Sequence, residues 1–136
     1  MNIMCVHDGH LRTPPLSDTI LAGVTRDSLL VIAKELGIPA SEEPIAIDDI
    51  VQGVSSGSVT ELMACGTAAV VVGIRSLTFE DGSKVKFPGA CPGRITTALH
   101  ETLVSIQYGR STDRHGWVHK VPERTAAPLG QSVGRG

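Results

Sequence analysis

Two short turns in the sequence combine glycine with threonine as phosphate-binding sites do. The first reads Gly23-Val24-Thr25 and directly precedes a predicted helix. Glycine lets a ligand approach the backbone closely, and a helix N-terminus presents unpaired N–H groups and a positive dipole end to an anion. Thr25 adds a hydroxyl donor. The first turn is therefore a candidate phosphate site, although the same residues also suit an ordinary capped helix start.

The second turn, Gly66-Thr67, joins two apolar segments. Its backbone N–H groups and its hydroxyl could meet the same phosphate, or they could meet a substrate carboxylate. The competing interpretation is a tight turn within a buried sheet. One α/β unit separates the two turns along the chain.

The first turn is positioned by a helix that we predict from Thr25 to Leu36, with Thr25 as its cap and Gly37 as its end. Its apolar stripe has the spacing i, i+3, i+4 and i+7 and consists of Leu29, Ile32, Ala33 and Leu36. A short helical turn is predicted from Asp48 to Gly53, capped by Asp48. A further helix is predicted to begin at Pro92 and to end at Gly109.

Strands are predicted on both sides of the second turn, over Val59–Met63 and Ala68–Val72, because both runs are apolar and partly β-branched. Asp8-Gly9 between two short extended runs predicts a hairpin. A second hairpin is predicted around Glu80-Asp81-Gly82. Glu43 to Ile47 is also expected to form a strand.

The composition fits one globular domain of 136 residues with a formal net charge of −2. Only 3% of the residues are aromatic and no basic stripe is present, so nucleic acid is not expected as a partner. No apolar run approaches the roughly 20 residues that span a bilayer. The cysteines, Cys5, Cys65 and Cys91, indicate reduced thiols in a cytoplasmic protein. His7 and His10 flank a glycine turn without a third ligand, so no metal site is expected.

Several segments, taken in order, resemble the branched-chain amino-acid aminotransferases, which are class IV, fold-type IV pyridoxal-phosphate enzymes. The segments are Thr13 to Leu16, Ile20 to Ser28, Ala64 to Ala69, Pro92 to Thr96, Ile106 to Gly109 and Asp113 to Trp117. The resemblance implies the C-terminal, cofactor-binding domain of that α/β fold over residues 1–121. That domain has a mixed sheet or pseudo-barrel with packed helices. Residues 122–136 are expected to form a disordered tail.

The resemblance also implies pyridoxal 5'-phosphate as the cofactor and assigns roles to the two turns. The residue like Leu21 packs on the pyridine ring, and Thr67 and Ala68 hold the substrate carboxylate. The cofactor-binding residues expected on this basis are Leu21, Gly23, Val24, Thr25, Gly66 and Thr67. The implied reaction transfers an amino group from leucine, isoleucine or valine to 2-oxoglutarate, and the complete family enzyme is a homodimer.

The resemblance places the Schiff-base lysine, and the glutamate that pairs with the pyridine nitrogen, upstream of the segment like Met1-Asn2. Neither residue has a counterpart here, so no catalytic residue is expected in this chain. We expect the chain to be inactive alone and to leave apolar surface exposed.

Two alternatives stay open. One is a non-catalytic remnant or module that binds pyridoxal phosphate or another phosphate compound, or that needs a separate N-terminal half. The other is a D-amino-acid transaminase or an aminodeoxychorismate lyase of the same fold. Cys65 to Ala68 and Gly116-Trp117 favour the branched-chain branch.

Overall fold

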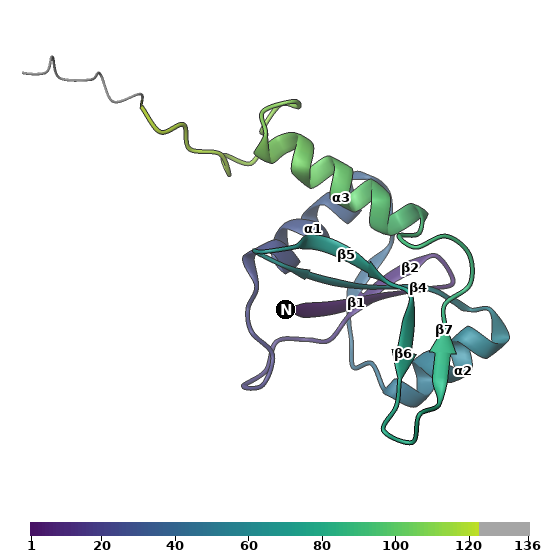
Figure 1. Cartoon of the computed structure of the whole chain (residues 1–136). Coiled ribbons are helices and arrows are strands. Elements are labelled where there is room, and N and C mark those ends of the chain that lie inside the picture. Colours follow the sequence, from purple (N-terminus) through teal and green to yellow (C-terminus); the bar gives the residue numbers. More distant parts are fainter. Residues whose placement is uncertain (123–136) are drawn as a thin grey trace, which may run out of the picture.

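Strand β1 (Asn2–His7) lies at the centre of a five-stranded sheet in the computed structural model, which describes residues 1–122 (Figure 1). The strand order is β3-β2-β1-β4-β5. The other strands are β2 (His10–Thr13), β3 (Ala40–Glu42), β4 (Val59–Gly66) and β5 (Val70–Ile74). Only β2 and β3 pair in parallel, so the predicted mixed sheet is confirmed.

Three helices and a second hairpin cover the two faces of the sheet. Helices α1 (Val24–Glu35) and α3 (Arg94–Gln107) lie on one face, and α2 (Ile47–Ser56) lies on the other (Figure 1). The hairpin of β6 (Ser76–Thr78) and β7 (Lys84–Lys86) also lies on the α2 side. The core between the sheet and α1 and α3 is the larger of two clusters and includes Met4, Leu11, Leu29, Met63 and Leu99.

The first hairpin forms where the sequence predicts it. Asp8 and Gly9 have φ angles of 49° and 74°, so both central residues of the turn are in the left-handed region. Such turns match the right-handed twist of paired strands, which explains why Asp-Gly sets the register of β1 against β2. The hairpin predicted around Asp81-Gly82 is confirmed as well.

The strand predicted from Glu43 to Ile47 is wrong. The strand is β3, and it ends at Glu42 because its partner β2 ends at Thr13, before two prolines. Glu43 still donates its N–H to the carbonyl of Thr13 (2.9 Å), but Pro44 has no N–H with which to extend the ladder.

The predicted helix starts are displaced by one or two residues. The N-cap residues are Gly23, Ala46 and Gly93, and none of the three forms a side-chain capping hydrogen bond. Thr25 and Asp48 therefore lie inside the first turns of their helices and are not caps, and Pro92 precedes α3. The second helix is also longer than expected, since it continues past the predicted end at Gly53 to Ser56 and is followed by a left-handed Gly57.

The second turn is also displaced along the chain. Strand β4 continues through Cys65 and Gly66, so the turn itself comprises residues 67–69. Val70 then follows with a φ of 55°, a region that β-branched residues rarely adopt. The surrounding sheet therefore holds this turn in place against local backbone strain.

The segment after α3 folds back on α1 through a small polar cluster. Asp113 accepts hydrogen bonds from the N–H groups of His115 (3.0 Å) and Val118 (2.8 Å). His115 lies 3.2 Å from a carboxylate oxygen of Glu35 and stacks on Trp117. The tail predicted over residues 122–136 lies, from residue 123 onward, outside the described residues.

Candidate functional site

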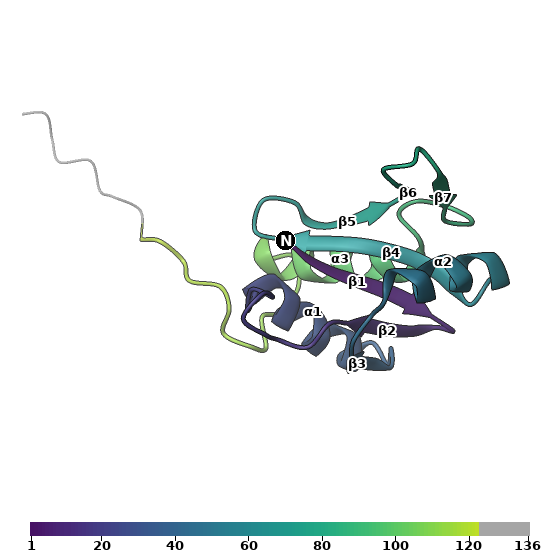
Figure 2. The same cartoon turned by 90° about the horizontal axis from the view of Figure 1, so that it is seen from below.

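The two turns lie at the same end of the sheet, on either side of the start of β1. Because β1 and β4 are antiparallel, Asn2 pairs with Cys65, and the start of β1 lies beside the end of β4 (Figure 2). A Cβ atom on Gly66 would lie 3.3 Å from Cγ of Met1. The Asn2 side-chain amide donates to the carbonyl oxygen of Leu21 at 2.8 Å. The first two residues of the chain thus contact both turns.

The first turn presents an open helix N-terminus at the surface. The Gly23 N–H donates to the Leu21 carbonyl (2.8 Å), and the Asp27 N–H donates to the Gly23 carbonyl (3.0 Å). The N–H groups of residues 24–26 precede that first helical bond, so they have no i−4 acceptor within α1. Leu21 and Val24 are 76% and 83% exposed, and Thr25 is half-buried. A ligand can therefore reach this backbone from solvent.

The N-terminus of helix α3 is of the same kind, and there the free N–H groups bind an anion. The carboxylate of Glu61, on β4, accepts the N–H groups of Ile95 and Thr96 at 2.9 Å each. It also accepts the Thr96 hydroxyl at 2.7 Å. Gly93 precedes this helix as Gly23 precedes α1, and a Cβ there would collide with the Glu61 carboxylate. One helix therefore binds an internal carboxylate at its N-terminus, whereas α1 is left open.

The second turn contributes a half-buried glycine and exposed donors. Gly66 is the last residue of β4, and Thr67 and Ala68 follow it at the surface. Cys65, just before the turn, is fully buried in the core. Burial raises the pKa of its thiol, and the opposing influences of Arg26 and the N-terminal amine do not cancel that effect. Cys65 is therefore a poor nucleophile, as a buried structural cysteine is.

Arg26 lies close to the turns, but its charge is directed elsewhere. The side chain is buried, and Nη2 donates to the carbonyl of Pro14 at 2.7 Å and pairs with Glu42. This contact fixes the segment before the first turn, and also β3, against α1. The donors that the residues of the two turns themselves present are therefore neutral N–H groups and hydroxyls.

The lysines of the chain are all exposed: Lys34, Lys84, Lys86 and Lys120. An amine that forms a carbon–nitrogen bond to a carbonyl must be desolvated to lose its proton near neutral pH. None of the four lies in such an environment.

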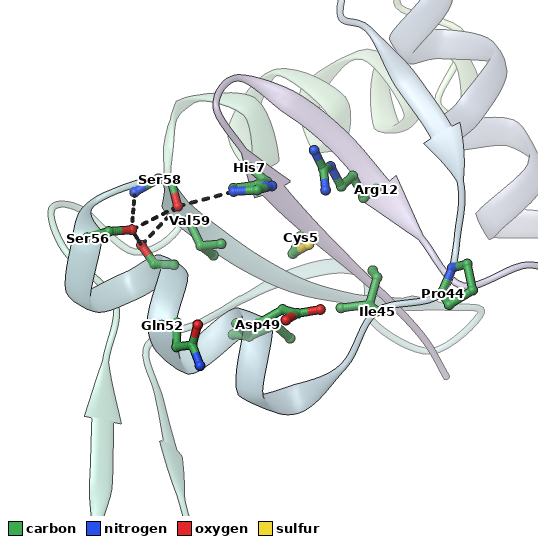
Figure 3. A pocket seen from close by; sticks show the side chains of 12 residues that line it. Cys5, His7, Arg12, Pro44, Ile45, Asp49, Gln52, Ser56, Ser58 and Val59 are labelled. Carbon is green, nitrogen blue, oxygen red and sulfur yellow. Dashed lines mark hydrogen bonds between the residues drawn. The ribbon is translucent and has the colours of Figure 1, made fainter.

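A separate cavity of about 390 Å³ lies between the sheet and α2, towards the opposite end of β1 (Figure 3). Two of its polar side chains lie close to other polar groups. His7 Nε2 lies 3.1 Å from the Ser58 hydroxyl, and Arg12 Nε lies 2.8 Å from a Glu43 carboxylate oxygen. Among residues 1–122, no group of three His, Cys, Asp or Glu side chains is arranged to hold a metal ion. In the same part of the chain, no helix has the length and apolar character needed to cross a membrane.

Comparison with known proteins decides the family. The model of the amino-transferase class IV family matches residues 1–77, a stretch that contains both turns. The chain belongs to the class IV aminotransferases. This confirms the family that the resemblance predicted.

The relatives with similar sequences are named as branched-chain-amino-acid aminotransferases. A probable branched-chain-amino-acid aminotransferase of Streptomyces coelicolor is 39% identical over 119 residues, which cover 88% of this chain and 33% of that protein. The branched-chain-amino-acid aminotransferase of Mycolicibacterium smegmatis is 41% identical over 111 residues, which cover 82% and 30%. This chain thus spans about a third of the length of these relatives.

Solved structures of class IV enzymes confirm the fold. The branched-chain amino acid aminotransferase of Escherichia coli superposes with a TM-score of 0.73 at 31% identity, covering 90% of this chain and 38% of that one. The enzyme from Thermoproteus uzoniensis, solved with norvaline, gives 0.62 at 35% identity and covers 77% and 31%. The described residues therefore have part of the fold-type IV architecture.

The sequence did not point to Asn2, which holds the first turn, or to Glu61, which holds the start of α3. A signal existed for Glu61, since a charged residue within a buried strand needs a partner. No local signal existed for Asn2, because its partner lies 19 residues away.

Proposed function

We propose that the two turns form the cofactor-phosphate and substrate-carboxylate part of a pyridoxal 5'-phosphate-dependent branched-chain aminotransferase. The observation that carries this proposal is the open N-terminus of α1 beside the Gly66-Thr67 turn, joined to it by Asn2. The family match supports the cofactor, and the names of the relatives support the substrate class.

The residues present suit a phosphate dianion. Glycine at position 23 leaves the backbone accessible, and Thr25 adds a hydroxyl to the free N–H groups of residues 24–26. Thr67 offers a hydroxyl from the second turn. Such neutral donors bind the anion and fix the orientation of the ring without adding a competing nucleophile. The exposed side chain of Leu21 gives one face of the ring an apolar contact.

When bound, pyridoxal phosphate supplies an electron sink for the negative charge that develops at the substrate Cα. This chain holds the substrate carboxylate through Thr67 and the N–H of Ala68, which orients the Cα–H bond relative to the ring. The proton itself must be moved by a desolvated amine, and all lysines here are exposed. We therefore propose that these 136 residues bind the cofactor but do not transaminate on their own.

Binding is best measured with pyridoxamine 5'-phosphate, because pyridoxal phosphate reacts through its aldehyde with exposed lysines. In titration calorimetry, pyridoxamine 5'-phosphate is expected to bind with higher affinity than unphosphorylated pyridoxamine. Thr25→Val and Thr67→Val are each expected to weaken this binding by at least about tenfold, the cost of one hydrogen bond to a charged group. Thr97→Val is the matched control, since Thr97 occupies the first turn of α3. Equal affinity for both pyridoxamine compounds would refute the phosphate assignment.

The proposed inactivity is tested with the purified chain, leucine, 2-oxoglutarate and pyridoxal phosphate. Robust turnover would contradict it. Addition of a lysine-bearing N-terminal segment of a relative separates the two remaining interpretations. Recovered activity would support a module that works with a second half, and no recovery would favour a non-catalytic phosphate-binding protein.

The finer assignments are also proposals. A role in branched-chain amino-acid biosynthesis follows from the relatives' names, and homodimer formation follows from the resemblance. A cytoplasmic location is supported by the free state of Cys5, Cys65 and Cys91. Sedimentation-velocity ultracentrifugation of the purified chain would test the dimer.

A further inference from the structure

The first turn is held in place by one buried side chain from outside it. Asn2 is 7% exposed and lies at the start of β1. Its amide nitrogen donates to the Leu21 carbonyl at 2.8 Å, and that same oxygen accepts the Gly23 N–H at 2.8 Å. The two bonds fix the Leu21 carbonyl from both sides, immediately before α1 begins.

The same side chain explains why position 23 is glycine. Gly23 has a φ of −74°, which any residue can adopt, so its backbone conformation does not require glycine. A Cβ atom at this position would instead collide with Oδ1 of Asn2. The Asn2 side chain thus occupies the space beneath Gly23, and the two residues fit as a pair.

Asn2 also connects the first turn to the second. Asn2 belongs to β1, and its backbone pairs with Cys65 of β4, the residue before Gly66. Its position is therefore fixed relative to the second turn. The backbone of Asn2 is thus fixed in the sheet, and its side chain is bonded to the first turn. The position of the sheet therefore sets the position of that turn. The distance between the N-terminus of α1 and the Gly66-Thr67 turn therefore depends on this contact.

We propose that Asn2 is the positioning residue of the phosphate-binding turn: its side chain holds residues 21–23 so that the N–H groups of α1 point at the same anion as Thr67. This inference rests on the proposed function. Asn2 itself need not contact the ligand. Its removal loosens the turn, and the free N–H groups are no longer preorganised for the anion.

The test compares Asn2→Ala with Thr13→Val. Thr13 is a matched control because it is fully buried and its hydroxyl also donates to a backbone carbonyl, that of Ile3 at 2.8 Å. Both variants lose one buried side-chain to backbone bond, so both are expected to lose similar stability in urea unfolding. Only Asn2→Ala is expected to weaken binding of pyridoxamine 5'-phosphate, by about tenfold.

Amide hydrogen exchange by NMR supplies a readout without ligand. In Asn2→Ala the Gly23 amide is expected to exchange at least about tenfold faster relative to amides of α3, whereas Thr13→Val leaves that ratio unchanged. A further variant, Gly23→Ala, tests the fit of the pair. It is expected to weaken binding strongly in the parent chain and much less in the Asn2→Ala background, a non-additivity that independent sites do not show.

The outcomes separate this inference from the proposed function. If the parent chain binds and Asn2→Ala binds equally well, the positioning role is refuted while the phosphate site stands. If the parent chain binds neither pyridoxamine 5'-phosphate nor inorganic phosphate, the proposed site fails. The role of Asn2 in holding the turn is then tested by hydrogen exchange alone. An unchanged ratio of the Gly23 exchange rate to the rates of the α3 amides would refute that role.

Discussion

Removal of the Glu61 carboxylate should destabilise the start of α3, and its hydrogen bonds allow the size of the effect to be worked out. The carboxylate receives two backbone N–H groups and one hydroxyl, all within 2.9 Å. Hydrogen bonds to charged groups contribute about 1.5–3 kcal/mol each, and loss of a helix cap costs about 1 kcal/mol. Three bonds at the lower end would add up to about 4.5 kcal/mol, but Glu61 is only half-buried and the three bonds share one group, so the total is smaller. We expect Glu61→Ala to lower the free energy of unfolding by about 3 kcal/mol.

Glu61→Gln separates the hydrogen bonds from the charge. The amide keeps one acceptor oxygen but loses the favourable interaction with the helix dipole, so we expect a loss of about 1–1.5 kcal/mol. Urea unfolding followed by circular dichroism measures both variants. Glu101→Ala, an exposed position on the same helix, is the control and should stay within about 0.5 kcal/mol of the parent chain. Equal effects of the Gln and Ala variants, or an Ala effect as small as the control's, would refute the reasoning.

Two further predictions concern the thiols and the C-terminal segment. At neutral pH iodoacetamide should modify the half-buried Cys91 well before the fully buried Cys65, whose pKa burial raises above its ordinary value of 9.0. Since the folded state holds that proton more tightly, Cys65 should make stability fall as the pH rises above about 9, and Cys65→Ala should lessen this fall. Asp113→Ala should increase the acrylamide quenching of Trp117, which is already 36% exposed, while Asp81→Ala, in the distant hairpin turn, should not. The N–H of Val118 holds the pKa of Asp113 below its ordinary value of 3.8. Quenching in the parent chain should therefore rise as the pH falls below about 3.8, and a flat profile would contradict this.

The local elements of the fold were largely predictable from the sequence. The Asp8-Gly9 turn and the helix after Gly23 follow from backbone preferences and periodicity, which act within a few residues. The position of β3 was not predictable, because its end depends on where its parallel partner stops, at Thr13, far away in the chain. Helix starts also shifted, since Gly93 could replace a capping side chain only because Glu61 supplies the carboxylate from β4.

In the site, too, the local features could be predicted from the sequence and the tertiary contacts could not. The glycines and threonines of the two turns could be recognised from their types and spacing, and the antiparallel pairing of β1 with β4 places both turns at one end of the sheet. What the sequence could not show is the contact that joins them. Asn2 has an unremarkable neighbourhood in the chain, and only the tertiary fold brings its amide to the Leu21 carbonyl.

The central claim is that both turns bind one phosphate group, and an NMR titration tests it most directly. Pyridoxamine 5'-phosphate is added to the ¹⁵N-labelled chain, and amide shifts are followed to saturation. The account predicts saturable shifts at residues 24–26 and at residues 67–68 with a single Kd, reproduced more weakly by inorganic phosphate. Shifts at only one turn, shifts confined to the cavity of Figure 3, or no saturable shift at all would contradict it.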